Sequence, residues 1–396
     1  MNITGIIAEY NPFHNGHAYQ LKKARELTDA DYLIVVMSGD FVQRGTPAIL
    51  EKHLRARAAL ENGADLVLEL PVRYSTASAM DFASGAVKIL DALNCVTHLC
   101  FGSESGTLAP LTAAAELLEC EPPEYREALQ SALREGLSYP LARQNAFESV
   151  LNSPEQYGTL LKAPNNILGI EYLRALLRLN STIHPITIER TSDNYHQKHL
   201  EDRFASATAV RTALLNGRPE NTAEYVPPQM QNMLETAVRQ NALLTEDDFS
   251  LVLRYQLQLS SPDDLAEYLD VPRSLANRIF RLRNEFTGFR QFADLLKTKE
   301  LTRTRINRSL LHILLRLKAT PQPLSHIRIL GFRKEASPLL TCLKKNSDLL
   351  PVTRLTALPE ASIAEDLFAS SLYHAALACR TGIPQPEERT IPVVII

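Results

Sequence analysis

Two histidines three residues apart carry the strongest chemical signal in the sequence. His14 and His17 stand in "EYNPFHNGH", where Asn15 and Gly16 turn an apolar run into a helical pattern that begins near His17. A helix N-terminus leaves backbone N–H groups unpaired and carries partial positive charge, so it can bind an anion. Gly16 lets a phosphate approach the backbone, and the imidazoles can stabilise negative charge that grows on a phosphate oxygen. The pattern predicts a nucleotide-phosphate site suited to adenylyl transfer.

Two other interpretations of this motif stay open. Two histidines at this spacing can bind a metal ion, but no H-E-x-x-H motif or third ligand stands nearby. A purely structural turn is the second alternative. The position of the motif between a first strand and a first helix favours the phosphate site, so we expect no metal held by the protein itself.

A second polar motif lies near residue 210. In "ASATAVR", residues 205–211, the hydroxyls of Ser206 and Thr208 can cap a helix start, and Arg211 can neutralise a triphosphate. An ordinary N-cap followed by a surface arginine is the alternative.

The elements that must position these residues follow an α/β pattern. Strands are expected at 3–8, 32–37, 66–70, 98–101 and 183–189, and helices at 17–27, 50–62, 79–93 and 166–179. This alternation of apolar strands and helices predicts a parallel sheet covered on both faces. Ligands bind at the carboxyl ends of such strands, so we expect the chemistry in the segments 9–17, 38–47, 71–78 and 102–106.

Beyond about residue 218 the strand signals fade and the composition changes. "PENTAEYVPPQMQ" resembles a linker, and the chain that follows is mostly helical with Pro and Gly breaks. The net charge is only −3, yet residues 271–345 hold 17 Lys and Arg against four acids, an excess of +13. Such an excess fits a nucleic-acid surface, and solvated helix faces are the alternative.

One helix of this basic window is expected to meet RNA. In "TRTRINRSLLHILL" apolar residues repeat at helical spacing, so that face should pack inward. Arg303, Arg305 and Arg308 flank the apolar stripe and can contact phosphates, which position a nucleic acid without reading its bases.

Several classes of protein and site are not expected. The start of the chain has no basic n-region or long apolar core, and no later segment offers about eighteen consecutive apolar residues, so neither a signal peptide nor a membrane span is predicted. The five cysteines have no zinc spacing and are expected to be reduced packing residues. We expect a cytoplasmic protein, with neither a membrane nor DNA as a partner.

The motifs together resemble a known family. His14–His17 is similar to the H-x-G-H motif of the nucleotidyltransferase superfamily, and 205–211 is similar to its I-S-S-T-x-x-R-like element, with Ala207 in place of the second serine. "EYNPFHNGH", "MSGDFVQRGTPA", "GADLVLELPV", "FGSE", "PNNILGIEYL" and "SATAVR" occur in the order, and at roughly the spacings, of the bacterial tRNA(Met) cytidine acetate ligase family. The resemblance covers residues 1 to about 215, and a weaker similarity is found in "TRTRINRSLLHILL".

This resemblance implies a function and a division of the chain. The family uses ATP to activate acetate as acetyl-adenylate, and then transfers the acetyl group to N4 of the wobble cytidine of elongator tRNA(Met). We therefore expect a Rossmann-like ATP-binding catalytic domain over 1–217 and a mainly helical, basic RNA-binding region over 218–396. Mg²⁺ is expected to be carried on ATP, held mostly by phosphates and water.

The resemblance also implies roles for individual residues. His14 and His17 would act in catalysis, Asp40 could accept a proton from the attacking amine, and Gln43 and Arg44 could meet acetate or the RNA. The ATP cradle would comprise Ile7, Ala8, Glu9, Tyr10, Asn11, Pro12, Phe13, His14, Asn15, Gly16, His17 and Gln20. Further nucleotide contacts would come from Gly102, Asn165, Arg190, Ser206, Thr208 and Arg211. Asn166 is expected to be the N-cap of the helix that follows it.

Two competing functions share part of this pattern. A small-molecule adenylyltransferase of the pantetheine-phosphate or nicotinate-nucleotide kind would carry the same two motifs, but it needs little beyond the nucleotide domain. A non-catalytic RNA-binding protein that retains an ATP fold has no obvious reason to keep both histidines. The additional 180 or so residues with a basic window favour the RNA-modifying ligase.

Overall fold

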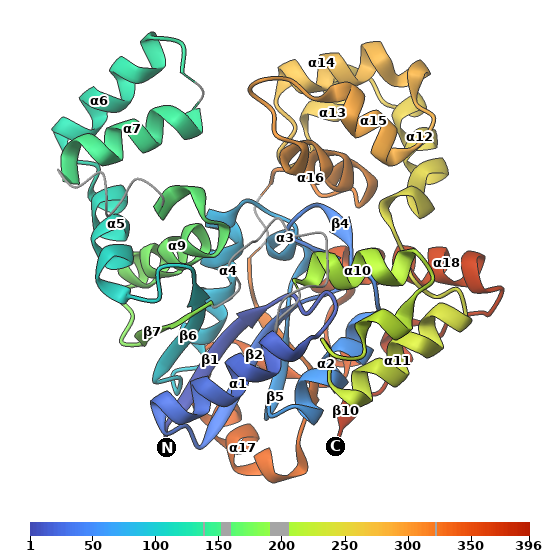
Figure 1. Ribbon diagram of the computed structural model, residues 1–396. Helices are drawn as coiled ribbons and strands as arrows, with labels where there is room; N and C mark the ends of the chain where they lie inside the picture. The colour runs from blue at the N-terminus through green and yellow to red at the C-terminus, as the bar shows by residue number, and fades with distance from the viewer. Residues whose placement is uncertain (138, 152–159, 191–205, 321–322) are drawn as a thin grey trace.

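The computed structural model describes residues 1–137, 139–151, 160–190, 206–320 and 323–396. At its centre lies a mostly parallel sheet with helices on both faces (Figure 1). Within the described residues its strands follow the order β10-β8-β5-β2-β1-β6-β7, with β9 beside β8. The strands are β1 Ile3–Ala8, β2 Tyr32–Ser38, β5 Leu66–Leu70, β6 His98–Ser103, β7 His184–Glu189, β8 His326–Phe332, β9 Leu350–Val352 and β10 Val394–Ile395. The predicted α/β class is confirmed.

Successive side chains of each strand point to opposite faces of the sheet, so the core forms two layers. Ile3 and Ile7 of β1 pack on one face of the sheet, whereas Ile6 packs on the other. The first face is covered by α4 Ala79–Ala92, α9 Pro164–Leu179 and α17 Ser337–Asn346. The second is covered by α1 Asn15–Thr28, α2 Lys52–Glu61, α10 Ala207–Leu215 and α11 Pro228–Arg239. Both faces are therefore closed to water, as a parallel sheet requires.

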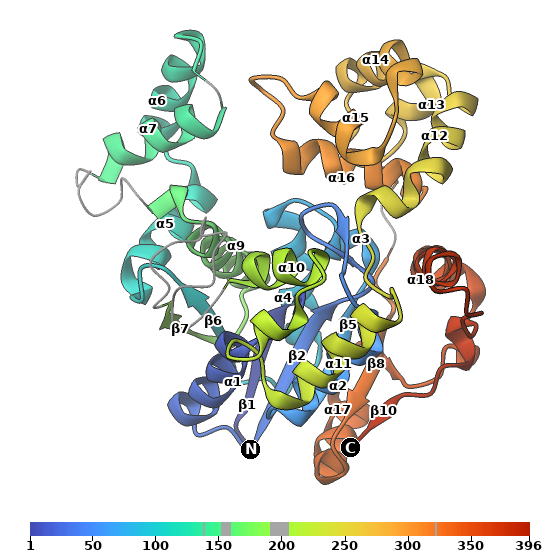
Figure 2. The ribbon, with the colours of Figure 1, turned by 45° about the vertical axis from the view of Figure 1, so that its right-hand side comes forward.

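Two helical arms stand beyond the carboxyl ends of the strands (Figures 1 and 2). One arm consists of α5 Leu108–Cys120, α6 Pro123–Arg134 and α7 Tyr139–Leu151. The other consists of α12 Ser250–Leu259, α13 Pro262–Ala266, α14 Arg273–Leu282, α15 Phe289–Leu296 and α16 Arg303–Leu314. The second arm has its own apolar core, which also takes in Phe41 and, from α18 Glu360–Thr381, Tyr373.

The chain returns to the sheet after the second arm, which the sequence pattern did not predict. β8 runs antiparallel to β5, so the sheet is not purely parallel. Arg328 interrupts the apolar run of β8 and hides its strand signal; in the fold this side chain is buried and paired with Glu69 and Glu388. The part after residue 218 thus contributes strands as well as helices, and the division at 217/218 stays a prediction. Among the described helices none is long and apolar enough to cross a bilayer.

Candidate active site

A cavity of about 590 Å³ opens at the carboxyl ends of the central strands. It lies where β1 is flanked by β2 on one side and β6 on the other, the point at which the strand order reverses. Its wall includes sixteen of the residues predicted from the sequence: Ile7, Ala8, Glu9, Tyr10, Asn11, His14, His17, Gln20, Gln43, Arg44, Gly102, Asn165, Arg190, Ser206, Thr208 and Arg211. Residues from six separate segments of the chain therefore meet in one cavity.

His14 and His17 are held by the first turn of α1. His14 is the N-cap, so the helix begins two residues before the predicted start. Its Nδ1 accepts the backbone N–H of Gly16 at 3.1 Å, and Nδ1 of His17 accepts the N–H of His14 at 3.2 Å. Since Nδ1 of each ring is an acceptor, a neutral ring carries its proton on Nε2. Both rings line the cavity, so each offers an Nε2–H donor to a ligand there.

The histidines are uncharged in this site. Burial, followed by the charges of Arg190 and Arg211, lowers the pKa of His14 to about 3. Burial, together with His14 and Arg190, also holds the pKa of His17 well below its usual value. The neutral rings stack with their centroids 3.6 Å apart. A bound triphosphate adds negative charge beside them and therefore raises both pKa values.

Arg211 and Arg190 supply positive charge to the cavity, whose wall also includes Arg44 and Arg290. Arg211 donates to the carbonyl oxygen of Asn11 at 2.6 Å and to Oγ1 of Thr208 at 3.0 Å. Burial, with the charge of Arg44, lowers the pKa of Arg211 to about 10, as expected where buried cations lie close together. Ser206 is the N-cap of α10 and accepts the N–H of Ala209, as predicted. Residue 205 lies outside the described residues.

Two glycines of the site make room for functional side chains. A Cβ at Gly102 would lie 3.1 Å from Cγ of Arg190, so Gly102 allows that arginine to cross the end of β6. A Cβ at Gly16 would lie 2.9 Å from Cε1 of His14, so Gly16 allows the ring to fold over the helix start. Both glycines therefore make room for protein side chains, whereas the sequence analysis predicted that they let a nucleotide approach the backbone.

The start of α9 differs from the prediction. Ala163 is the N-cap and Pro164 begins the helix, so Asn166 lies inside the first turn. The carboxylate of Glu104 accepts the backbone N–H groups of Asn165 and Asn166 at 3.2 and 2.8 Å, and so satisfies the helix end from another segment. It also accepts Nδ2 of Asn165 at 2.7 Å, which fixes that side chain at the cavity wall.

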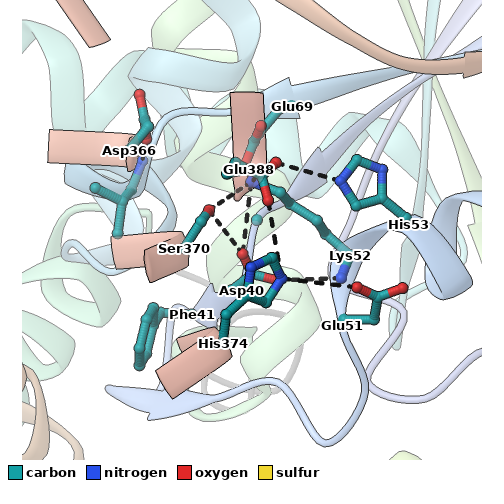
Figure 3. A network of polar contacts seen from close by, with 12 residues as sticks. Asp40, Phe41, Glu51, Lys52, His53, Glu69, Asp366, Ser370, His374 and Glu388 are labelled. Atoms are coloured by element: carbon teal, nitrogen blue, oxygen red, sulfur yellow. Dashed lines mark hydrogen bonds and ion pairs between the residues drawn. The ribbon is translucent and has the colours of Figure 1, made fainter. Parts of the chain in front are cut away.

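Asp40 lies away from the cavity, contrary to the prediction that it meets the attacking amine. It is 3 % exposed, and its carboxylate accepts the N–H of Lys52 at 3.1 Å and the hydroxyl of Ser370 at 2.9 Å. Figure 3 shows it inside a buried polar network. The network joins the ends of β2 and β5 to α18 and to Glu388, through Nζ of Lys52, which lies 2.8 Å from Glu69 and 3.0 Å from Glu388.

The charges in this network compensate one another. Burial by itself raises the pKa of Asp40, but the charges of Lys52, Arg55 and His374 together outweigh it and hold the pKa below its ordinary value. Burial also opposes the charge on Glu388, yet Lys52 and the hydrogen bond from His53 keep its pKa low. Asp40 therefore stays ionised and has a structural role, because its carboxylate is held in ion pairs and hydrogen bonds within the network.

The segment after Asp40 forms a small hairpin, β3 Phe41–Val42 and β4 Thr46–Pro47, beside the cavity. Gln43 and Arg44 lie at its turn and line the cavity, in the place expected for substrate contacts. A Cβ at Gly45 would clash with the backbone nitrogen of Arg308, so the hairpin packs against the middle of α16. The hairpin therefore connects the cavity to the second arm, called the basic arm below because it holds part of the basic window 271–345.

The three predicted RNA-contacting arginines of α16 differ in environment. Arg303 pairs with Asp294, and Nε of Arg308 lies 3.1 Å from Asp270. Arg305 is exposed. The three side chains are therefore not equally available to RNA, because Arg303 and Arg308 form ion pairs that stabilise the arm.

Some of the other residues predicted to surround ATP contact other parts of the protein and do not line the cavity. Pro12 and Phe13 are buried, and Asn15 donates its backbone N–H to Tyr225 at 2.8 Å. The sequence did not identify several wall residues, which are mostly apolar or lie on the second arm: Val42, Thr46, Pro47, Ile49, Ala79, Phe82, Phe101, Pro164, Ile167, Leu168, Tyr172, Ala207, Leu215, Leu244, Thr245, Glu246, Arg290, Thr304 and Asn307. Nothing in their local pattern separates a wall residue from a core residue. Within the described ranges no group of three or more His, Cys, Asp or Glu could hold a metal ion.

Comparison with known proteins matches nearly the whole chain. The family model described as HIGH Nucleotidyl Transferase matches residues 1–384. The tRNA(Met) cytidine acetate ligase of Thermoanaerobacter sp. (strain X514) is 40% identical over 387 residues, 95% of this chain and 96% of the relative. The enzyme of the same name from Clostridium tetani is 37% identical over 384 residues, 94% of this chain and 95% of the relative.

Solved structures agree with these relatives. Thermotoga maritima TmcAL in an apo crystal form matches with a TM-score of 0.92 and 31% identity, over 100% of both chains. A second crystal structure of that protein, bound with alpha-thio ATP, matches with a TM-score of 0.88 and 31% identity, again over 100% of both chains.

Proposed function

Because this chain belongs to the tRNA(Met) cytidine acetate ligases, within the HIGH nucleotidyltransferases, we propose that it uses ATP to activate acetate as acetyl-adenylate and transfers the acetyl group to N4 of the wobble cytidine of elongator tRNA(Met). One observation carries the proposal: two neutral histidines and two arginines converge on a cavity at the carboxyl end of β1. That arrangement suits a polyphosphate, and one related structure holds an ATP analogue.

His14 and His17 act on the phosphate that is attacked. When the acetate oxygen attacks the α-phosphorus of ATP, negative charge grows on the phosphate oxygens and pyrophosphate leaves. Two Nε2–H donors held by backbone hydrogen bonds stabilise that charge without reorganising.

Arg190 and Arg211 hold the nucleotide before and during reaction. A guanidinium binds phosphate oxygens in the ground state as well as in the transition state, so these residues contribute to affinity more than to turnover. Mg²⁺ travels with ATP in this proposal, and it neutralises charge on the departing pyrophosphate when bound. Among the described residues the cavity wall has no cluster of metal-binding side chains, so the phosphates and water would hold the ion.

The RNA meets the other side of the cavity. We place the anticodon region of the tRNA against the β3–β4 hairpin and the second arm, where Gln43, Arg44 and Arg305 lie. The same proposal puts the enzyme in the cytoplasm, where tRNA and ATP are found. The relatives match nearly the full length, including the basic arm, which favours an RNA substrate over the small-molecule adenylyltransferase considered above.

Acetate-dependent exchange of labelled pyrophosphate into ATP, without RNA, tests the first half-reaction. We expect exchange with acetate and none with phosphopantetheine or nicotinate mononucleotide. Exchange that depends on either of those compounds instead of acetate would reject the ligase in favour of a small-molecule adenylyltransferase.

A further inference from the structure

The cavity contains two carboxylates among the described residues, and they differ in their partners. Glu246 is paired with Arg290, whose Nη2 and Nε each lie 3.1 Å from Oε2. Glu9 accepts the backbone N–H of Gln43 through Oε1 at 2.8 Å. Within the described part of the chain no cation lies within ion-pair distance of Glu9, so its second oxygen is not committed to a salt bridge.

We propose that Glu9 is a catalytic residue of the second half-reaction, where its carboxylate accepts a hydrogen bond from the N4 amine of cytidine and takes the proton that the amine loses on acetylation. This inference rests on the proposed function. A carboxylate recognises the amino group of cytosine because that group is a hydrogen-bond donor. Asp40, the base suggested by the sequence, lies in the buried network instead.

Glu9 is fixed at both its backbone and its side chain. Nη1 of the buried Arg55 donates to the carbonyl oxygen of Glu9 at 2.7 Å, and the hairpin donates the N–H of Gln43 to the carboxylate. The residue follows β1 directly, at the point where the strand order reverses. A base held in this way stays in position for proton transfer while the substrate enters.

The charges around Glu9 place it beside the phosphate site. The charge of Arg211 affects the pKa of His14, and the charge of Glu9 in turn affects the pKa of Arg211. The charge of Glu9 also affects the pKa values of Arg55 of α2 and Tyr172 of α9. Glu9, Arg211 and the two histidines line the same cavity, so the carboxylate lies near the phosphate site.

The step balances without a further reactant. The nitrogen lone pair of N4 attacks the carbonyl carbon of acetyl-adenylate, forming the C–N bond, and the bond between that carbon and the phosphate oxygen breaks. AMP leaves with the electron pair of that bond. One N4 proton passes to Glu9 and then to water. Only the amine attack, and not the formation of acetyl-adenylate, needs this base.

Glu9→Gln separates the two half-reactions. Glutamine keeps the side-chain length and an oxygen that can accept the N–H of Gln43, but it cannot take a proton. We expect single-turnover acetyl transfer from preformed acetyl-adenylate to tRNA to be slower on the order of 10², a much larger loss than that of acetate-dependent pyrophosphate exchange.

A matched control is Glu61→Gln, an exposed glutamate at the end of α2, which should change neither half-reaction. Thermal midpoints of both variants establish that they are folded. If exchange and transfer fall together, or excess Mg²⁺ restores both, Glu9 serves nucleotide or metal binding and the inference is wrong. Transfer at the wild-type rate would also overturn it. A failure of wild type itself to acetylate tRNA would instead reject the proposed function.

Discussion

The imidazole rings of His14 and His17 lie stacked, with centroids 3.6 Å apart and planes inclined by 22°. Two protonated rings would repel one another at this separation, and burial with nearby positive charge keeps both neutral. Each ring uses Nδ1 to accept a backbone N–H, so the stack presents two Nε2–H donors. The first turn of α1 thus caps the helix and also presents two hydrogen-bond donors to a phosphate.

His14→Ala and His17→Ala should each slow acetyl-adenylate formation by about 10²–10³, because each removes a donor to phosphate charge in the transition state. Pyrophosphate exchange with purified variants measures this rate. Loss of the cap hydrogen bonds should cost about 1 kcal/mol of stability, which leaves the fold intact. A variant that exchanges at the wild-type rate would show that its histidine serves another step.

Arg190→Ala and Arg211→Ala should weaken ATP binding more than they reduce turnover, since a charge contact to phosphate acts before as well as during the reaction. Titration calorimetry with ATP, alongside exchange rates at saturating ATP, separates the two effects. Arg211→Lys is the control, because it keeps the charge but loses the fork that reaches Asn11 and Thr208. Lower turnover with unchanged ATP affinity would contradict this assignment.

Local patterns in the sequence were sufficient to predict the elements that carry the two phosphate-site motifs. The strand Ile3–Ala8, the turn at Gly16 and the cap at Ser206 depend on neighbours in sequence, so they could be predicted. Asp40 could not be placed, because its partner Ser370 is 330 residues away and nothing near Asp40 indicates it. For the same reason β8 was missed: Arg328 makes a poor strand residue until Glu69 and Glu388 neutralise it.

Arg305→Glu should weaken tRNA binding and flatten its salt dependence, while acetyl-adenylate formation without tRNA stays near normal. Each phosphate contact that is lost lowers the slope of log affinity against log salt by about 1. Reversal of all three arginines should weaken binding further, but it also breaks the pairs with Asp294 and Asp270. Arg305→Glu is therefore the cleaner test, by filter binding across a salt series. Unchanged affinity in this variant would place the RNA elsewhere.

Asp366 gives a prediction for stability against pH. Burial, together with Glu69, raises its pKa to about 7, above the value near 4 of an unfolded chain. The folded protein therefore holds this proton between about pH 4 and 7, and the stability it contributes is lost as pH rises through that window. Asp366→Asn keeps an acceptor for the N–H of Val72, so it should be about 1–2 kcal/mol more stable than wild type at pH 8.

Urea unfolding at pH 4.5 and pH 8 checks this result, and the difference between the proteins should be small at the lower pH. Asp348→Asn, at an exposed carboxylate, is the matched control and should show no such change. Equal stability of Asp366→Asn and wild type at pH 8 would mean that Asp366 is ionised in the fold at little cost.

The most direct test of the account is transfer of labelled acetate to RNA. The protein is incubated with ATP, labelled acetate and elongator tRNA(Met), the RNA is digested to nucleosides, and the label is located by chromatography. We predict label in N4-acetylcytidine, dependent on ATP, and none in a transcript whose wobble cytidine is replaced by uridine. Label in no nucleoside, or equal label in both transcripts, would contradict the assignment of this chain as a wobble-cytidine acetate ligase.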